Sequence, residues 1–580
     1  MEFLEQIITT LEHYVWSWPE IGGELSLIVI ALLGTGVFLT LRLGFIQIRH
    51  LAHGIGVTSG KYDDPDEPGD VSHFQALTTA LSATVGIGNI AGVAIAIHWG
   101  GPGALFWMWV TALLGMAVKY SEVTLAQHYR VVEFPDQDAK AWEGSVSGGP
   151  MYYIEKGLGK NWKPLAVFFA GALMITSFLT GNAVQANTVA DIVNTEYGLP
   201  VWITGLITAG IVALVIIGGI GRIGKVTGIL APVMAVIYVF GALVIILMNV
   251  GEVPAAFALI FQEAFSPSAG VAGTGTGVFL LTMMWGVRRG LFSNEAGQGS
   301  APIAHAAAKT DEPVSEGVVA LLEPFIDTIV ICSMTGLVIL TTGVWNQPLP
   351  TTLDLSSGDI TYVAPDERGV FAGGDAPAEI RVENGTPTYV DGDNHFAWHD
   401  VAVESFFLDE AQTQPFTGTL IAGEGHAVTD DGVQYGVLYG DAVETAAPLT
   451  SAAFSQGLGR FGMGGVGNFI VLLSVLLFAI STSISWSYYG DRCANYLFGK
   501  GGILPYKAVF VIMHYVGATV PLAAIWVLGD VALGLVTFPN LIALVLLSGV
   551  VVKLTKSYFE RKPWVENAEA HKRAKAEGRI

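Results

Sequence analysis

Long stretches of the chain contain few or no Asp, Glu, Lys or Arg residues, and these stretches mark the predicted helices. About 20 apolar residues cross the hydrocarbon core of a membrane, where a charged side chain is costly. By this criterion the sequence predicts eleven membrane-spanning helices, at residues 24–42, 73–98, 103–130, 163–192, 200–220, 225–250, 271–290, 316–342, 464–490, 506–528 and 531–553. The predicted fold is therefore an all-α polytopic membrane protein.

Two of these helices are predicted to be broken. The second contains Gly86 and Gly88 near its middle, and glycine weakens a helix by about 1 kcal/mol per residue. The seventh ends in a Gly-rich, polar segment, Trp285 to Gly297. If the first helix is an extra, the other ten divide into five plus five, and a broken helix opens each half. Paired breaks are typical of transporters built from inverted repeats. The alternative is that the glycines only allow close helix packing.

The break in the second helix is predicted to bind substrate. An unwound segment exposes amides and carbonyls away from water, and these groups can hold a zwitterion or a cation. We expect the amides near Gly86 and Gly88 to bind a carboxylate and Asn89 or Gln185 to bind an ammonium group. Asn182 and Gln185 are uncharged amides within the fourth helix. The alternative for both is hydrogen bonding between helices.

Clustered hydroxyls in the ninth helix predict a sodium site. Ser481, Thr482, Ser483 and Ser485 lie within two helical turns, and Na⁺ is a hard cation that prefers oxygen ligands. The alternative is that these hydroxyls bond back to their own helix. Trp486, one turn after Thr482, is expected to limit the size of the pocket. The predicted Na⁺ ligands are Ser82, Val85, Phe478, Ser481 and Thr482.

Composition supports the membrane class. The 580 residues are 52% hydrophobic and 13% charged, with a mean hydropathy of +0.54. Soluble domains carry about 25% charged residues, so the composition excludes soluble, disordered and fibrous proteins. The chain has two cysteines, Cys332 and Cys493, which excludes a disulfide framework and is interpreted as two inert thiols.

Charge is divided between the two predicted sides. The loops on one side hold 25 of the 28 Lys and Arg residues, which places that side in the cytoplasm. The predicted N-terminus is then outside and the C-terminus cytoplasmic. The net charge of −22 is concentrated in residues 344–455, with 18 acidic residues and two Arg. We expect this block to be a small β-rich or loop-rich extracytoplasmic insertion whose acidity keeps it hydrated.

Four segments carry a resemblance to a known family. They are Ser82 to Gly92, Gly100 to Ala112, Arg289 to Gly297 and Trp486 to Gly490, and together they resemble the alanine or glycine:cation symporters, also called sodium:alanine symporters. The resemblance implies a fold like that of the leucine transporter, with one extra helix and a five-plus-five inverted repeat. It also implies sodium-coupled import of small neutral amino acids by alternating access, across the plasma (inner) membrane.

The predicted organisation follows from these patterns. Residues 1–343 hold the extra helix and core helices one to seven, 344–455 the insertion, 456–553 core helices eight to ten, and 554–580 a basic tail. Na⁺ is the expected coupling ion, and no organic cofactor, nucleic acid or obligate protein partner is expected beside substrate and membrane lipid. The predicted substrate contacts are Thr84, Gly86, Gly88, Asn89, Asn182, Gln185, Phe279, Met283, Trp285, Thr482 and Trp486.

Three other functions remain open at this stage. A proton-coupled transporter would use intramembrane carboxylates such as Glu122, Glu323 and Asp327, which are interpreted as gate or ion-pair residues with Lys119 or Arg289. An ion channel would line a pore with the same broken helices. An enzyme is not expected, because the sequence has no metal-ligand spacing around its histidines and no nucleophile motif.

Overall fold

The computed structural model describes most of the chain. The described residues are 10, 13–17, 26–133, 143–266, 279–357, 359–365, 371–389, 394–421, 424–460, 462–520 and 522–577. Residues 24–25 of the first predicted helix and 271–278 of the seventh lie outside them.

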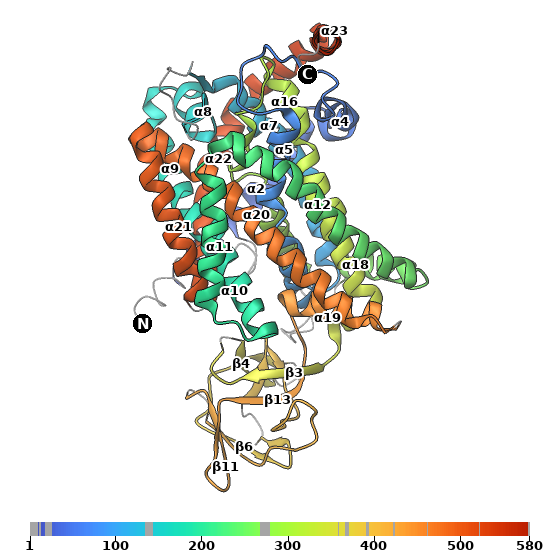
Figure 1. Ribbon diagram of the computed structural model, residues 1–580. Helices are drawn as coiled ribbons and strands as arrows, with labels where there is room; N and C mark the ends of the chain where they lie inside the picture. The colour runs from blue at the N-terminus through green and yellow to red at the C-terminus, as the bar shows by residue number, and fades with distance from the viewer. Residues whose placement is uncertain are drawn as a thin grey trace.

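The first half of the chain is a helical bundle with short connections (Figure 1). Its helices are α2 (Leu27–Arg42), α3 (Ile46–Arg49), α4 (Leu51–Thr58), α5 (His73–Thr84), η2 (Gly88–Gly92), α6 (Val93–Gly100), α7 (Ala104–Tyr129), α8 (Pro150–Gly157), α9 (Lys163–Phe178), η4 (Leu179–Ala183), α10 (Val184–Tyr197), α11 (Val201–Ile216), α12 (Gly219–Met248) and α13 (Val253–Phe265). Short pieces are η1 (His13–Ser17), η3 (Lys160–Trp162), β1 (Val131–Val132) and β2 (Val146–Ser147).

The second half continues the bundle after a further set of breaks. Its helices are α14 (Phe279–Asn294), α15 (Ala301–His305), α16 (Pro313–Ala320), α17 (Leu322–Pro324), η5 (Phe325–Cys332), α18 (Ser333–Thr342), η6 (Val344–Asn346), α19 (Ala446–Gly459), α20 (Gly464–Phe498), η7 (Lys500–Gly502), α21 (Ile503–Thr519), α22 (Leu522–Arg561) and α23 (Trp564–Ala576).

The long apolar helices identify a polytopic membrane protein. Among the described residues, six helices are long and apolar enough to cross a membrane, or seven if α5 and the following segment Gly88–Gly100 form one bent span. The prediction of a membrane protein is therefore confirmed. The count of eleven spans and the inverted repeat stay predictions.

Three long helices contain π-helical segments at polar residues. These segments are η2 around Asn89, η4 around Asn182 and η5 around Asp327. A π-helical turn adds a residue to the turn, disturbs the regular ladder of hydrogen bonds and is often found at functional sites. The side chains at these points are buried, so the disturbed backbone faces the inside of the bundle.

The insertion is a β-rich unit at one end of the bundle. Its antiparallel sheets have the strand orders β12-β11-β10-β6-β7, β5-β4-β8-β9 and β13-β3, around buried side chains such as Phe396, Phe406 and Phe416. The strands are β3 (Leu349–Asp354), β4 (Ile360–Pro365), β5 (Phe371–Gly373), β6 (Ile380–Glu383), β7 (Thr386–Thr388), β8 (His395–Trp398), β9 (Val401–Ala402), β10 (Gly418–Ile421), β11 (His426–Thr429), β12 (Gln434–Tyr435) and β13 (Val437–Ala442).

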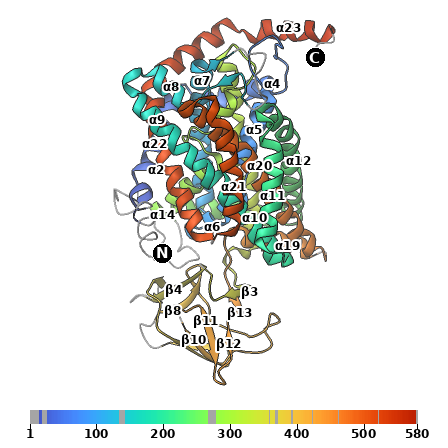
Figure 2. The same ribbon diagram turned by 60° about the vertical axis from the view of Figure 1, so that its left-hand side comes forward.

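The two ends of the bundle carry different elements. Figure 2 shows the strands at one end and α4, α8 and α23 at the other. This separation agrees with the predicted distribution of charge, because α4, α8 and α23 belong to the predicted cytoplasmic loops and tail. The insertion contacts its end of the bundle through the carbonyl of His399, which lies 2.9 Å from Nε2 of His98 on α6.

Candidate functional site

The second predicted helix is broken at the glycines. Helix α5 ends at Thr84, Val85 leaves the helical conformation with ψ of 89°, and the chain resumes at Gly88 after a bend of 55°. The amide of Gly86 donates a hydrogen bond to Oδ1 of Asn89 at 2.9 Å. Backbone groups that lack helical partners are therefore present inside the bundle, where their hydrogen bonds must be made by side chains or by a ligand.

Helix α20 places hydroxyl oxygens against this break. Thr482 Oγ1 lies 3.2 Å from the carbonyl oxygen of Ser82, and Ser481 Oγ lies 3.3 Å from the same oxygen and 2.8 Å from that of Phe478. Ser82 Oγ is buried and has no hydrogen-bond partner among the described residues. Four of the five predicted sodium ligands, Ser82, Phe478, Ser481 and Thr482, thus lie together. The fifth, Val85, follows Ser82 by three residues. Hydroxyl and carbonyl oxygens are the donors that a hard cation prefers.

Gly86 allows the close contact between the break and α20. A Cβ atom at Gly86 would lie 2.8 Å from Thr482 Oγ1 and 3.8 Å from Gln185 Oε1. Gln185 donates from Nε2 to the carbonyl of Thr180 at 3.2 Å, and its buried Oε1 has no partner within the described part of the chain. The predicted contacts Gly86, Gln185 and Thr482 therefore meet, with an amide oxygen available for a donor.

Asn89 connects the break to a buried carboxylate. Its Nδ2 donates to Asp327 Oδ1 at 2.7 Å and to Ser293 Oγ at 3.0 Å. Ser293 and Thr328 donate to the other carboxylate oxygen of Asp327, at 2.6 and 2.7 Å. Ser293 lies in the motif Arg289 to Gly297, but its contact with Asn89 was not predicted from the sequence. The polar run from Ser293 to Glu295 at the end of an apolar helix was the available signal.

The second interruption falls at the end of its segment. Helix α14 runs through Gly286 and Gly290 to Asn294, and the chain then turns with positive φ at Glu295 (54°), Gly297 (96°) and Gly299 (77°) before α15. In this turn Glu295 Oε1 accepts a hydrogen bond from Nε1 of Trp486 at 3.0 Å. Both interrupted segments therefore contact α20, the first through Thr482 and the second through Trp486.

Trp486 is held in a fixed position beside the fourth helix. A Cβ atom at Gly181 would lie 2.3 Å from Cγ of Trp486, so only glycine leaves room for the indole ring. The hydrogen bond to Glu295 fixes the other edge of the ring, and Ser300 donates in turn to Glu295. Trp486, four residues after Thr482, is accordingly held in one orientation against Gly181, four residues before Gln185.

Two predicted substrate contacts make hydrogen bonds elsewhere. Thr84 Oγ1 donates back to the carbonyl of Ala80 at 3.2 Å. Asn182 donates to the carbonyl of Phe510 at 2.7 Å and its Oδ1 lies 2.7 Å from Nδ1 of His514, both on α21. In this structure the side chain of Asn182 joins two helices, which was the alternative interpretation of that residue.

The predicted wall from α14 lies toward the insertion end. Phe279 is 36% exposed and its ring centroid lies 5.5 Å from that of Trp107, whereas the ring of Trp285 stacks 6.0 Å from Trp99. Met283 is buried between them along the same helix. Phe292, about two turns beyond Trp285, is the aromatic residue that meets the break, with Cδ1 3.0 Å from a Cβ placed at Gly88.

The buried carboxylates are paired in part as expected. Lys119 Nζ lies 2.8 Å from Glu323 Oε1, and both side chains are fully buried. Glu122 accepts hydrogen bonds from the amide of Gly297 and from Asn540 instead. The interpretation as an ion pair is confirmed for Glu323, and Arg289 lies 3.3 Å from a carboxylate oxygen of Asp530.

Comparison with known proteins identifies several similar sequences. Residues 1–363 and 411–573 match the model of the sodium:alanine symporter family. The chain is 40% identical to the sodium/alanine symporter AgcS of Methanococcus maripaludis, over 98% of this chain and 100% of that protein. It is 31% identical to the putative sodium/proton-dependent alanine carrier protein YrbD of Bacillus subtilis, over 96% and 93% of the two chains. It is also 30% identical to the probable sodium/glutamine symporter GlnT of the same organism, over 97% and 92%.

Proposed function

Because the chain belongs to the sodium:alanine symporter family, we propose that it uses a sodium gradient to import alanine or glycine across the plasma membrane by alternating access. Family membership establishes amino-acid:cation symport, which is transport rather than enzymatic catalysis. The observation that carries the finer proposal is the contact of Thr482 and Ser481 with the Ser82 carbonyl, directly beside the break at Gly86.

Na⁺ is proposed to bind where α20 meets the end of α5. Its ligands are the carbonyls of Ser82, Val85 and Phe478 with the hydroxyls of Ser481 and Thr482. One Na⁺ crossing 100 mV supplies about 2.3 kcal/mol. A tenfold concentration gradient adds about 1.4 kcal/mol, and the two together support roughly 500-fold accumulation of a substrate carried with one ion. Bound Na⁺ stabilises the break and so raises the affinity for the substrate.

The amino acid is proposed to bind on the other side of Gly86. Its carboxylate takes the amide of Gly88 and replaces Asn89 Oδ1 as the acceptor for the amide of Gly86. Its ammonium group takes Oε1 of Gln185, which is buried without a partner among the described residues. Trp486 faces the substrate side chain. Because the indole is held by Gly181 and Glu295, the pocket favours a small side chain.

Counterflow in proteoliposomes tests the substrate and the ion together. Purified protein is reconstituted into proteoliposomes, and these are preloaded with one unlabelled amino acid at a time from a panel of D- and L-forms. Uptake of labelled alanine is then followed with and without Na⁺. We expect alanine and glycine to drive counterflow only when Na⁺ is present. A larger amino acid such as glutamine driving faster counterflow than alanine would contradict the proposed pocket.

Removing one proposed sodium ligand gives the first prediction. Thr482→Ala is expected to weaken the apparent Na⁺ affinity by about 10- to 150-fold. The lost contact between the hydroxyl oxygen and the ion is taken to contribute as much as a hydrogen bond to a charged group, about 1.5–3 kcal/mol. The measurement is the Na⁺ dependence of alanine uptake. Ser487→Ala is the matched control on α20, since this buried hydroxyl bonds back to Ile484 and should be silent. Equal Na⁺ affinity in wild type and Thr482→Ala would place the ion elsewhere.

Proton coupling is a second candidate, favoured by Asp327. This carboxylate is fully buried, its hydrogen-bond partners are neutral, and one of them is Asn89 at the break. A buried carboxylate with neutral partners is a proton carrier in many transporters. If protons drive transport, acidic external pH sustains accumulation when choline replaces Na⁺, and Asp327→Asn abolishes that accumulation.

The choline experiment gives the second prediction. We expect no alanine accumulation in choline at acidic external pH, because the oxygen cluster at Ser82 needs a metal cation. Asp327→Glu is the companion variant, since it keeps the acid and moves it by one methylene. Accumulation in choline by wild type that is lost in Asp327→Asn and retained in Asp327→Glu would replace the sodium proposal with proton coupling.

A further inference from the structure

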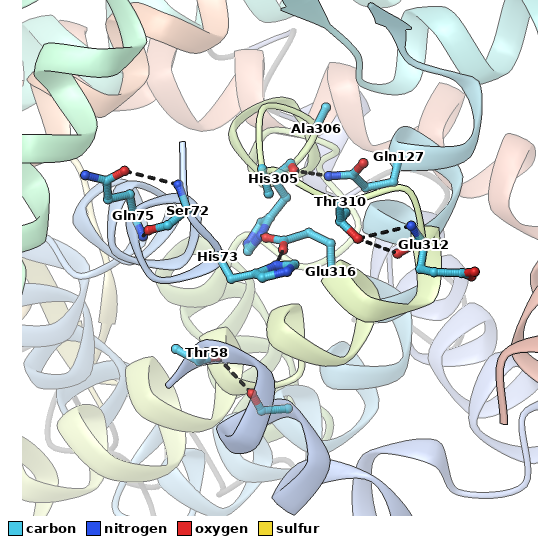
Figure 3. A network of polar contacts seen from close by, with 12 residues as sticks. Thr58, Ser72, His73, Gln75, Gln127, His305, Ala306, Thr310, Glu312 and Glu316 are labelled. Atoms are coloured by element: carbon cyan, nitrogen blue, oxygen red, sulfur yellow. Dashed lines mark hydrogen bonds and ion pairs between the residues drawn. The ribbon is translucent and has the colours of Figure 1, made fainter. Parts of the chain in front are cut away.

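A chain of buried ionisable side chains closes the end of the bundle opposite the insertion. Figure 3 shows the rings of His73 and His305 facing the carboxylate of Glu316. His73 Nδ1 contacts Oε2 of Glu316, and His305 Nδ1 lies 2.5 Å from Oε1 of the same residue. The other ring nitrogen of His305 lies 3.5 Å from Oε2 of Glu323, whose Oε1 pairs with Lys119. All five side chains are at most 2% exposed.

The geometry around His305 favours a bound proton. A neutral imidazole has one N–H donor and one lone pair, but both ring nitrogens of His305 face carboxylate oxygens. A lone pair aimed at a carboxylate is repelled, so the arrangement is favourable when the ring is an imidazolium or when a carboxylate carries the proton. With His305 protonated, the two positive charges of His305 and Lys119 balance Glu316 and Glu323.

The surrounding charges favour the same proton. Glu122 on α7 and Glu295 in the turn before α15 lie near Lys119 and add negative charge when they are ionised. Asp63 and Glu67, from the loop before α5, lie near His73. Arg130, the residue after the end of α7, directs its guanidinium to the carbonyls of Ala306 and Ala308, and Tyr489 on α20 supplies a neutral phenol near Glu323. Carboxylates therefore outnumber cations around His305.

These five ionisable side chains connect helices that lie next to the two breaks. His73 is the first residue of α5, which ends at the break of Val85 to Ile87. His305 is the last residue of α15, which follows the turn at Glu295 to Ser300. Glu316 and Glu323 belong to α16 and α17, and Lys119 to α7. Interrupted segments can absorb changes in φ and ψ, so α5 and α15 can move without breaking a continuous helix.

We propose that His305, between Glu316 and Glu323, is a proton-binding site that locks this end of the bundle closed. The inference rests on the alternating-access cycle proposed above. When α5 and α15 separate from α16 and α7, water replaces the carboxylates and the ring loses its proton to the compartment on this side, predicted to be the cytoplasm. When they close again, the ring takes a proton from the same compartment. Protons are therefore bound and released without crossing the membrane.

The direction of the pH effect follows from the number of bound protons. Burial alone would lower the pKa of His305, but the carboxylates of Glu316 and Glu323 raise it to about 9 in the closed state. Between about pH 6.5, above which a hydrated histidine is neutral, and about pH 9, the closed state therefore binds one more proton at His305 than the open state. Raising the pH on this side therefore favours opening, and lowering it favours closure. One proton gives up to about a tenfold change in the ratio of open to closed states per pH unit.

Hydrogen exchange on the wild-type protein tests the lock without requiring transport. Exchange of the amides of α5 is measured in proteoliposomes at several pH values and corrected for the intrinsic exchange rate. Between about pH 6.5 and 9, we expect the protection of α5 to fall by up to about tenfold for each unit of rising pH. Protection of α5 that does not change with pH would overturn the proposal, whatever substrate the protein carries.

A pair of histidine variants provides the matched comparison. His305→Gln cannot bind the proton, so the pH dependence of its α5 protection is expected to be weaker than in wild type, and what remains is due to His73, which also contacts Glu316. His128→Gln removes an exposed histidine in the last turn of α7 and should retain the wild-type pH dependence. A folded His305→Gln protein with the wild-type pH dependence would overturn the proposal, and if this variant does not fold the wild-type exchange decides. Loss of alanine counterflow with an intact pH response of α5 would refute the transport proposal and leave the lock standing.

Discussion

Gly86→Ala is expected to lower Na⁺-dependent alanine uptake by about 5- to 150-fold while the protein still folds. The added methyl group would lie 2.8 Å from Oγ1 of Thr482, a proposed sodium ligand, on the side where Gln185 also approaches. Overpacking of a filled interior costs about 1–3 kcal/mol, and each 1.4 kcal/mol changes binding tenfold. The backbone of Gly86 does not have positive φ, so the expected effect is steric and local.

The measurement is uptake of labelled alanine at saturating and limiting Na⁺ in proteoliposomes with equal amounts of protein. Gly171→Ala on α9 is the matched control, because its Cβ would meet no heavy atom within 4 Å. Thr482→Ser keeps the hydroxyl and removes only the methyl group, so it should not rescue Gly86→Ala. Wild-type uptake by Gly86→Ala would show that the contact between the break and α20 is not part of the transport site.

The sequence predicted the break and the oxygen cluster because both depend on local patterns. Gly86 and Gly88 interrupt an apolar run beside the polar residues Thr84 and Asn89. Ser481 and Thr482 follow Phe478 at helical spacing, so their common orientation could be predicted before their partner was known.

The depth of α14 could not be predicted in the same way. The placement of Phe279, Met283 and Trp285 beside the substrate stays a prediction, and the contacts of Phe292 and Ser293 with the break were not anticipated. An apolar helix can slide along its axis with little change in its hydrophobic pattern, and the position is set by tertiary contacts such as Trp99 with Trp285.

Contacts between distant polar residues were also beyond prediction. Asn89 and Asp327 are 238 positions apart in the sequence, and each alone is consistent with bonding between helices, as found for Asn182. The insertion was recognised from its charge, but its last part is not β-structure. Helix α19 begins at Ala446, within the acidic block, and Thr450 donates to the carbonyl of Ile90 in η2.

Lys119→Met is expected to lower the free energy of unfolding by about 3–5 kcal/mol, the cost of leaving one partner of a buried ion pair without its counter-charge. Lys119 and Glu323 are both 0% exposed and 2.8 Å apart. The loss is large because Glu122 and Glu295 also lie near the ammonium group, so its removal leaves three carboxylates without that cation.

The double variant Lys119→Met with Glu323→Gln tests this cause. Removing both charges leaves no uncompensated ion at this pair, so the double variant should recover most of the lost stability. Unfolding is followed in mixed micelles with increasing denaturing detergent. Lys556→Met is the surface control, because Lys556 and Glu560 are 76% and 65% exposed and 3.8 Å apart. An exposed pair contributes about 0–1 kcal/mol, so a drop for Lys119→Met no larger than for Lys556→Met would show that the buried charges are hydrated and that this end of the bundle is not sealed.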